Sequence, residues 1–458
     1  MNITRTIEIL FKRYLPSPFT IAILLTFLAM VLALCFTKPV GEDYHIFEIL
    51  SFWEKGIWNE GLLVFAYQMM LILVLGHVLV LSKPVNKLIV SLSKNVTNTS
   101  TAVVLVSITT MLMAFLNWGL GLIFGAILAR KVGEHAQRNN IPLNYSLVGA
   151  SGYVGLMIWH GGISGSAPIK VAESGHIKSL MHGITSSEII NQIPESINFN
   201  TTIFSWWNLV LFGVLLVLVP SVLKQLAKTT RPTNFKLKEY QFKTGEKSNL
   251  EGAEQLDFSG ILGIGFGVIL LIAFVYQYWG NLLSLQITPN MLNFFMLGLA
   301  IILHKNFSNF LNAVEEAIKG TSGILIQFPL YFGIMGIMKY SGMVVMISDF
   351  FVSIATTTTL PIFTFFSAGL VNIFVPSGGG QWAVQGPIVI ESALKLDVPL
   401  PKAIMALAYG DQITNMFQPF WALPLLGITK LKAKDILPYT LILMLVGISV
   451  YILGLILF

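Results

Sequence analysis

Asn372-Ile-Phe-Val-Pro-Ser-Gly-Gly-Gly-Gln-Trp-Ala-Val-Gln-Gly-Pro387 is the stretch of sequence that decides the fold. It interrupts an apolar run, residues 361–394, in which Glu391 is the one charged residue. Pro376 removes a backbone donor and ends the preceding helix. The three glycines that follow let the backbone expose bare N–H groups, and a new helix is expected to start near Gln381.

Each apolar flank of this stretch is about fifteen residues long, which is too short to cross a membrane alone. A non-helical backbone at membrane depth is tolerated only where it is buried in protein or lines a wet cavity. The stretch therefore predicts a hairpin whose tip is a helix N-terminus, which is a favourable place for an anion. The alternative is a loop outside the membrane.

Composition indicates a polytopic membrane protein. The chain has 458 residues, of which 55% are hydrophobic and 11% charged, whereas soluble domains carry about 25% charged residues. The net charge of +6 does not indicate a nucleic-acid partner, because the basic residues gather in particular loops, as cytoplasmic anchoring requires. The one cysteine, Cys35, excludes an internal disulfide and a cysteine-based metal site.

The hydropathy pattern predicts an all-α integral membrane protein with about 9–11 membrane segments. The apolar segments are residues 19–36, 61–81, 102–129, 145–169, 203–222, 258–278, 291–303, 321–338, 361–394, 403–429 and 436–458. Residues 344–354 are shorter, contain Asp349 and are expected at the interface. A polar, lysine-rich stretch suggests three parts: a first membrane repeat (1–223), a cytoplasmic linker (224–257), and a second repeat with an extra helix (258–458).

Loop charges predict the orientation. The basic N-terminus and the linker are expected inside, and the acidic loop 38–60 outside. Basic loops at 83–94 and 130–138 flank residues 102–129. That segment should therefore enter and return on the same side, as a re-entrant hairpin broken near residues 117–121. The hairpin tipped by residues 376–380 should enter from the opposite side.

The two halves show matching features at a near-constant spacing. Gln68 and Gln327 are 259 residues apart (327 − 68), and Asn117 and Asn372 are 255 apart (372 − 117). Two further polar breaks, residues 160–168 and 411–419, also correspond. Matching halves with oppositely oriented hairpins are typical of inverted-topology repeats in a secondary transporter. For Gln68 and Gln327, lining the cavity and bonding a neighbouring helix both stay open.

The two hairpin tips and two broken helices are expected to meet near the middle of the membrane and form the substrate and ion sites. They contain no lysine or arginine except at their ends, so backbone N–H groups and side-chain donors would bind an anion, which suits a small monoanion better than a dianion. The predicted substrate site comprises Asn117, Trp118, Gly119, Gly121, His160, Ser164, Gly165, Ser166, Asn372, Pro376, Ser377, Gly378, Gly379, Gly380, Gln381 and Trp382.

Asp411 is the one charged residue between positions 403 and 429, and a carboxylate inside a membrane span is a functional hypothesis by default. It is expected to carry a coupling proton or to help bind Na⁺ with Asn415; Gln412 and Gln418 complete the predicted ion-coupling set. The alternative is a structural carboxylate satisfied by helix N–H groups and Gln412. His160 is a candidate proton relay or substrate donor, or a core histidine.

Tryptophans stand beside the breaks at Trp118, Trp382 and Trp421. They either form the apolar wall of a pocket or belong to the aromatic belts of the membrane surface.

Five motifs resemble the short-chain fatty acid transporter family, of the bacterial acetoacetate and butyrate permease type within the ion-transporter superfamily. The motifs are Phe115-Leu-Asn-Trp-Gly-Leu-Gly121, Ser164-Gly-Ser-Ala-Pro168, Pro376-Ser-Gly-Gly-Gly-Gln-Trp382 with Gln385-Gly-Pro387, Ala408-Tyr-Gly-Asp-Gln412 and Gln418-Pro-Phe-Trp-Ala-Leu-Pro424. The resemblance covers essentially the whole chain. It implies uptake of short monocarboxylates across the inner membrane. By superfamily analogy it implies inverted repeats, often in a homodimer with an elevator-like motion.

Residues and resemblance together predict a cation-coupled symporter for short-chain fatty acids or acetoacetate, with H⁺ or Na⁺ as the coupling ion and no other cofactor. The rivals are a carrier for dicarboxylates or another organic anion, an antiporter of cations, and a channel. A membrane enzyme lacks support, because the sequence has no His-Glu-x-x-His, Gly-x-Ser-x-Gly or phosphate-loop motif.

Overall fold

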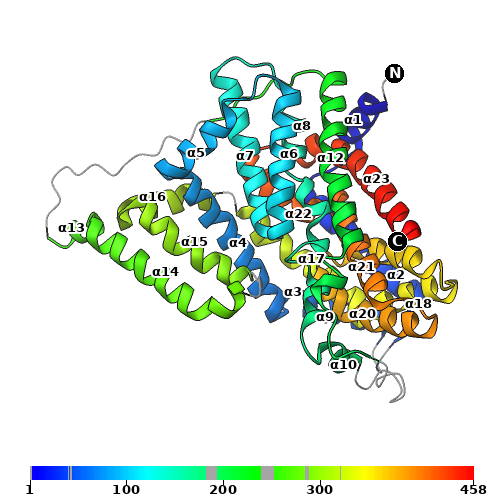
Figure 1. The fold of residues 1–458 in the computed structure, drawn as a ribbon. Coiled ribbons are helices and arrows are strands. Elements are labelled where there is room, and N and C mark those ends of the chain that lie inside the picture. Colours follow the sequence, from blue (N-terminus) through cyan, green and yellow to red (C-terminus); the bar gives the residue numbers. More distant parts are fainter. Residues whose placement is uncertain are drawn as a thin grey trace.

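The computed structural model describes residues 3–39, 41, 44–181, 193–238, 252–283, 288–319 and 321–458, and every regular element within them is helical (Figure 1). Among these elements, seven helices are long and apolar enough to cross a membrane. They are α2 (Pro18–Phe36), α4 (Glu60–Leu81), α6 (Thr99–Leu116), α12 (Trp206–Thr229), α14 (Gly260–Leu283), α17 (Ser322–Tyr340) and α23 (Ala433–Leu457). The prediction of an all-α, multi-pass membrane protein is confirmed.

The other helices are shorter or more polar. They are α1 (Ile3–Tyr14), α3 (His45–Ile57), α5 (Lys83–Ser93), α7 (Trp118–Arg138), α8 (Tyr145–Ser151), α9 (Ser166–Ala172), α10 (His176–Met181), α13 (Glu254–Asp257), α15 (Pro289–His304), α16 (Phe307–Ile318), α18 (Met343–Ser353), α19 (Leu360–Phe374), α20 (Gly378–Lys395), α21 (Leu400–Thr414) and α22 (Pro419–Thr429). Four 3₁₀ turns are η1 (Val154–Met157), η2 (Trp159–Gly161), η3 (Phe199–Thr201) and η4 (Asn415–Phe417). The predicted linker, 224–257, begins inside α12, and its residues 239–251 lie outside the described residues.

Helices α6 and α7 form the first helical hairpin, and they lie side by side (Figure 1). The chain reverses at Asn117, as the sequence predicts, and Gly121 lets the two arms approach closely. A Cβ atom at Gly121 would stand 2.4 Å from the Cβ of Ala114 on the other arm. The reversal is thus built from one polar cap residue and one small residue.

Helices α19 and α20 form the second hairpin, and polar bonds join its arms. Gln381 donates to the carbonyl of Ala368 at 2.9 Å, and Gln385 donates to the hydroxyl of Ser367 at 3.1 Å. The second arm starts at Gly378, three residues earlier than predicted. The reason is Ser377, whose hydroxyl accepts from the N–H of Gly380 at 3.2 Å and caps a first turn made of glycines.

Both predicted broken helices are interrupted: the second break lies within the predicted residues 411–419, and the first includes residues 160–165 but begins earlier than predicted. The first is already interrupted after Ser151, where Gly152 ends α8, and it continues through η1 and η2 before α9. The second stays helical through Asp411 and is interrupted at Asn415. Side chains from other helices bind the last carbonyl groups of α21, so the helix extends one turn farther than its sequence indicates.

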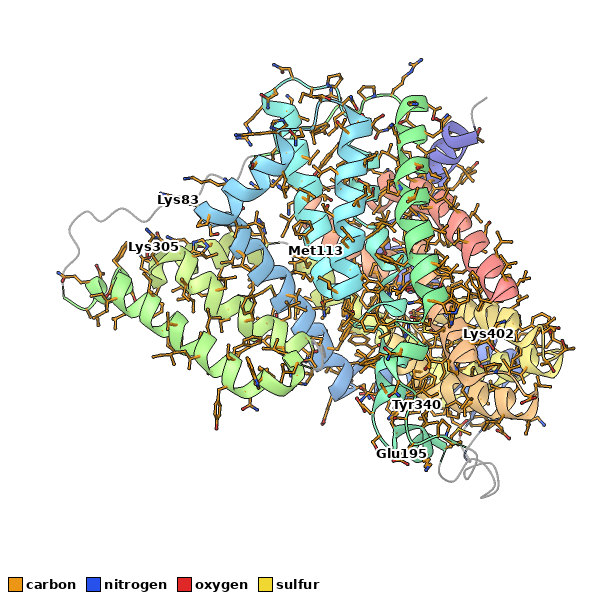
Figure 2. All side chains as sticks on the ribbon, in the orientation of Figure 1. Lys83, Met113, Glu195, Lys305, Tyr340 and Lys402 are labelled. Atoms are coloured by element: carbon orange, nitrogen blue, oxygen red, sulfur yellow. The ribbon has the colours of Figure 1, made fainter. Side chains whose placement is uncertain are left out.

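Helices α14, α15 and α16 lie together on one side of the molecule, and α4 separates them from the rest (Figure 1). Helix α15 also contacts α5, which starts at Lys83 (Figure 2). His304 donates to the carbonyl of Val78 at 2.8 Å and joins α15 to α4. The loop predicted outside, residues 38–60, contains an unpredicted helix, α3, which packs against α17.

Gly410 brings α21 against α19 and so positions the following residue, Asp411. A Cβ atom at Gly410 would stand 2.1 Å from the carbonyl oxygen of Phe365, which is backbone and cannot move aside alone. Gly410→Ala should therefore force the two helices apart and destabilise the protein by about 1–3 kcal/mol. Thermal unfolding in detergent measures this, with Gly265→Ala in α14 as the control, because nothing lies within 4 Å of a Cβ there. Equal melting temperatures for the two variants would contradict the close contact.

Candidate functional site

A histidine and an aspartate from the two interrupted segments form a buried pair. His160 in η2 is fully buried, and Asp411 in α21 is 1% exposed. The Nδ1 atom of His160 bonds to Oδ2 of Asp411. The backbone N–H of Ala167 donates to Nε2 of His160 at 3.0 Å, which assigns the ring proton to Nδ1. The pair is therefore a neutral imidazole donating to a carboxylate, with one negative charge in total.

Gln412 ties three elements together around this pair. Its Oε1 accepts from the backbone N–H groups of His160 at 2.7 Å and Gly161 at 3.1 Å. Its Nε2 donates to the hydroxyl of Tyr451 in α23, which donates to the carbonyl of Met157, each at 2.8 Å. Both ends of the Gln412 amide are thus occupied by the first interrupted segment and α23. It positions His160 and does not satisfy the neighbouring carboxylate.

Asn372, near the end of α19, holds the second interruption. Its Nδ2 donates to the carbonyl of Asp411 at 2.7 Å and to Oδ1 of Asn415 at 2.8 Å, and Gln418 donates back to its carbonyl. The hydroxyl of Tyr153 lies 2.9 Å from the carbonyl of Asn415 and 3.1 Å from that of Gln418. The break in the second half is stabilised by a tyrosine from the first.

Three oxygen atoms beside the second break have no hydrogen-bond partner among the described residues. They are Oδ1 of Asp411, Oδ1 of Asn372 and Oε1 of Gln418, all on buried side chains. An unsatisfied buried acceptor costs about 1–3 kcal/mol, and more when it is charged. In transporters with broken helices, such oxygens take the coupling Na⁺ or H⁺. The donor set fits a monovalent cation, and binding there stays a prediction.

The tip of the second hairpin touches the first interrupted segment. A Cβ atom at Gly378 would stand 2.8 Å from Trp159, 2.9 Å from the His160 ring and 3.2 Å from the Ser166 hydroxyl. Only glycine fits there. Pro376 forms the turn that leads into this tip, since its neighbours Val375 and Ser377 bond at 2.7 Å across it. Gly379 also lies near the Ser166 hydroxyl, at 3.9 Å.

The tip of the first hairpin also contacts the first interrupted segment. Asn117 caps α7 by accepting from the N–H of Leu120 at 3.0 Å. The N–H of Trp118 donates to the hydroxyl of Ser164 at 2.9 Å. Gly165 allows the chain to fold back over the carbonyl of His160, which would stand 2.0 Å from a Cβ there. Both predicted tips thus meet at residues 160–166.

Four predicted substrate residues make contacts away from the His160 ring. Gly119 lies beside Ile72 and Leu292 near the tip of its hairpin, and Gly121 faces Ala114 within it. Gln381 bonds within the second hairpin. Trp382 is buried, but its indole N–H donates to Nε2 of His176 at 3.1 Å, away from the His160 pair. Burial, with Lys170 nearby, holds the pKa of His176 below its usual value, which favours the neutral ring that accepts this bond.

A layer of aromatic side chains lies beside the two breaks, and the sequence analysis predicted only part of it. Trp118 packs edge-on against Trp421 with ring centroids 5.1 Å apart, and it also lies 6.0 Å from Trp159. Phe328 of α17 stacks on Phe420 at 4.1 Å. Trp159 and Trp421 are buried and Trp118 is half-buried, so both Trp118 and Trp421 pack against the protein core.

The two glutamines that match between the halves differ in role. Gln68 donates to Asn290 of α15 at 2.8 Å, so it bonds a neighbouring helix. Gln327 lines a cavity, and its Oε1 is buried without a partner in the described part of the chain.

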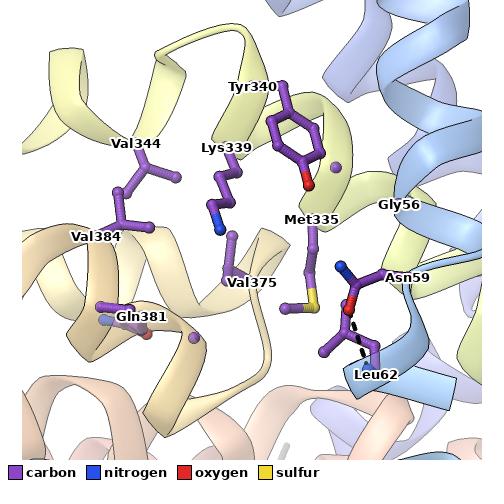
Figure 3. A pocket seen from close by; sticks show the side chains of 13 residues that line it. Gly56, Asn59, Leu62, Met335, Lys339, Tyr340, Val344, Val375, Gln381 and Val384 are labelled. Carbon is purple, nitrogen blue, oxygen red and sulfur yellow. Dashed lines mark hydrogen bonds between the residues drawn. The ribbon is translucent and has the colours of Figure 1, made fainter.

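A cavity of about 130 Å³ lies beside the second hairpin tip (Figure 3). Gly380 and Gln381 line it together with Asn59, Met335 and Lys339. Figure 3 shows the Lys339 side chain pointing toward Val375, which precedes the tip. The interrupted segments alone supported the prediction of a substrate site without a lysine or arginine side chain. Lys339 was not predicted there because it belongs to another helix, α17.

Comparison with known proteins extends over the full chain. The family described as short chain fatty acid transporter matches residues 1–458. A protein of Escherichia coli (strain K12), provisionally named a short-chain fatty acid transporter, is 34% identical and covers 100% of this chain and 99% of its own length. A protein of Haemophilus influenzae with the same provisional name is 32% identical and covers 99% of both chains.

Among solved structures, Neisseria gonorrhoeae MtrF, described as illuminating a class of antimetabolite efflux pumps, is 14% identical with a TM-score of 0.41. It covers 98% of this chain and 97% of its own. The family and the two curated relatives name a transporter and not an enzyme. The resemblance carried by the sequence motifs is confirmed, and the chain belongs to the short chain fatty acid transporter family.

Proposed function

We propose that this protein is a cation-coupled symporter that imports short-chain monocarboxylates, such as butyrate, acetate and acetoacetate, across a bacterial inner membrane. The proposal includes two inverted-topology repeats with re-entrant hairpins, a cytoplasmic N-terminus and linker, and a homodimer. The observation that carries it is Asp411, a buried carboxylate where both interrupted segments and the second hairpin meet.

The charge of this site explains why a cation is needed. The His160–Asp411 pair holds one negative charge, and a bound monocarboxylate adds another. Charges inside a membrane are costly unless they are paired. Each coupling cation removes one negative charge from the loaded site, so binding of the substrate and the cation support each other thermodynamically.

A proton and a sodium ion would act on this site in different ways. A proton that arrives at Nε2 of His160 must break the bond from the N–H of Ala167, in the first turn of α9. The neighbouring Ser166 faces the Gly378 tip, so protonation would couple directly to the tip. Sodium would instead bind Oδ1 of Asp411 with the free oxygens of Asn372 and Gln418.

In the proposed mechanism, the glycine tip at the start of α20 binds the carboxylate of the substrate. The first N–H groups of a helix have no acceptor within the helix and carry partial positive charge. In α20 the hydroxyl of Ser377 binds the N–H of Gly380, and the two preceding glycines lie beside Ser166. A substrate carboxylate that reaches this tip would find backbone donors with the Ser166 hydroxyl beside them.

Asp411→Asn should abolish accumulation of butyrate against its gradient but spare exchange of labelled for unlabelled butyrate. The asparagine keeps the shape of the side chain and removes the charge that the cation neutralises. Uptake and counterflow in proteoliposomes measure the two activities. The matched control is Asp349→Asn, since Asp349 is exposed on α18. Accumulation by Asp411→Asn at the wild-type rate would disprove the coupling role.

Imposed gradients should identify the coupling ion. Na⁺ and H⁺ gradients are applied separately, and labelled butyrate is expected to accumulate in proteoliposomes under one of them and not under the other, because one site takes one kind of cation. A competition panel tests the substrate class in the same assay. Succinate competing better than butyrate would replace the monocarboxylate with a dicarboxylate.

A further inference from the structure

Helix α17 connects two cavities, one at each of its ends. At its C-terminal end is the cavity that contains Lys339 (Figure 3). At its N-terminal end, Ser322, Gly323 and Gln327 line a larger cavity of about 620 Å³. The residues of α17 between these cavities, Phe328 to Ile334, are buried except for Pro329 and Leu330. The helix thus runs from one cavity, through a packed layer, to the other.

The larger cavity is strongly basic. Its charged residues are Lys319, Lys430, Lys432 and Lys434, and no carboxylate is among the described residues that line it. Glu316 pairs with Lys319 at 2.5 Å. Burial, followed by the charge of Arg130, holds the pKa of Lys430 below its usual value. The first turns of α2, α17 and α23 also line the cavity and add three positive helix ends. Such a cavity raises the local concentration of anions.

A cluster of aromatic rings follows Gln327, which lines this cavity, along α17. Phe420 lies at the centre: Phe328 stacks on it at 4.1 Å, and Tyr331 and Trp421 meet it edge-on at 5.0 Å and 4.9 Å. Phe65 of α4 borders Phe328 and Trp421 at 6.4 Å and 6.2 Å. Gln327 lines the cavity and lies one helical turn from Tyr331, so an anion leaving the cavity would meet this layer next.

Two hydrogen-bond donors in the layer are buried and unused. The hydroxyl of Tyr331 and the indole N–H of Trp421 have no hydrogen-bond partner among the residues that the structure describes, although these side chains are only 1% and 4% exposed. Leaving such a donor unpaired costs about 1–3 kcal/mol. The other fully buried tyrosines of the core avoid that cost: Tyr153, Tyr409 and Tyr451 all donate hydrogen bonds.

Tyr331 also lies beside the second break. Its ring packs edge-on against Phe420, the second residue of α22, at 5.0 Å. Trp421 is the third residue of α22, which starts immediately after this break. Both donors therefore lie near the second break, and the unpaired oxygens of Asp411 and Gln418 lie at the same break.

We propose that Tyr331 and Trp421 bind the carboxylate of a short-chain monocarboxylate, whose alkyl chain packs against Phe65, Phe328 and Phe420. The assignment rests on the proposed function and adds a substrate station between the basic cavity and the Asp411 break. Two neutral donors can each donate to one oxygen of a carboxylate. Packed aromatic walls favour a short apolar chain and exclude a second carboxylate, which would have no partner there.

Two conservative variants test this station. Tyr331→Phe and Trp421→Phe each remove one donor and keep an aromatic ring. A hydrogen bond to a charged group contributes about 1.5–3 kcal/mol, so equilibrium binding of labelled butyrate to the full-length protein in detergent should weaken tenfold or more. The maximal rate of counterflow should change less than the butyrate KM. Tyr276→Phe is the control, because Tyr276 is exposed on α14.

Thermal unfolding separates binding from a structural role. If Tyr331 serves the substrate, then Tyr331→Phe removes an unpaired buried group and the ligand-free melting temperature stays equal or rises. The increase in melting temperature that saturating butyrate gives the wild type should shrink in the variant. A lower ligand-free melting temperature with an unchanged butyrate shift would show a structural role and overturn the assignment.

The outcomes show whether the substrate station alone is wrong or the proposed function is wrong as well. Wild-type binding and KM in both variants, in a protein that still transports butyrate, would overturn the station and leave the symporter intact. A wild-type protein that neither binds nor transports butyrate or acetoacetate would overturn both.

Discussion

The structure depends on one constraint: where a helix is interrupted inside a membrane protein, the freed backbone groups need partners from elsewhere in the chain. Each interruption finds some of them in the other half. Gln412 binds the N–H groups of His160 and Gly161, and Tyr153 serves the carbonyls of Asn415 and Gln418. Each break takes some of its bonds from its own half and the rest from the other, so the two halves must fold against each other before either break is fully bonded.

The His160–Asp411 pair follows from this exchange. Once Gln412 holds the backbone of His160, the imidazole lies against the carboxylate one position before the glutamine. The same imidazole accepts from the N–H of Ala167, so the charge of Asp411 is connected through one ring to the first turn of α9. The Gly378 tip touches that ring and the neighbouring Ser166. A chain of direct contacts therefore joins Asp411 to a hairpin tip.

Much of the membrane fold could be predicted because hydropathy and broken periodicity are local properties. The breaks near Asn117 and Pro376, and the absence of lysine and arginine from the interrupted segments, could be predicted from the residues themselves. The residues at which the helices begin and end could not. Asp411 lies inside α21 because Asn372, from another helix, binds its carbonyl, and α20 starts at Gly378 because of one serine cap. Trp382 points away from the site because His176 takes its N–H.

The sequence by itself determined the class of the protein, the places where helices cannot continue and the one carboxylate that is costly to bury. Proline, glycine and aspartate impose those limits wherever they occur in a membrane segment. Only the tertiary structure decided which polar groups are paired and which are left over. Tyr331 and Gln412 look alike in sequence as polar residues on apolar helices, yet one has no partner among the described residues and the other is fully bonded. That difference arises from packing between helices distant in sequence, and no local pattern records it.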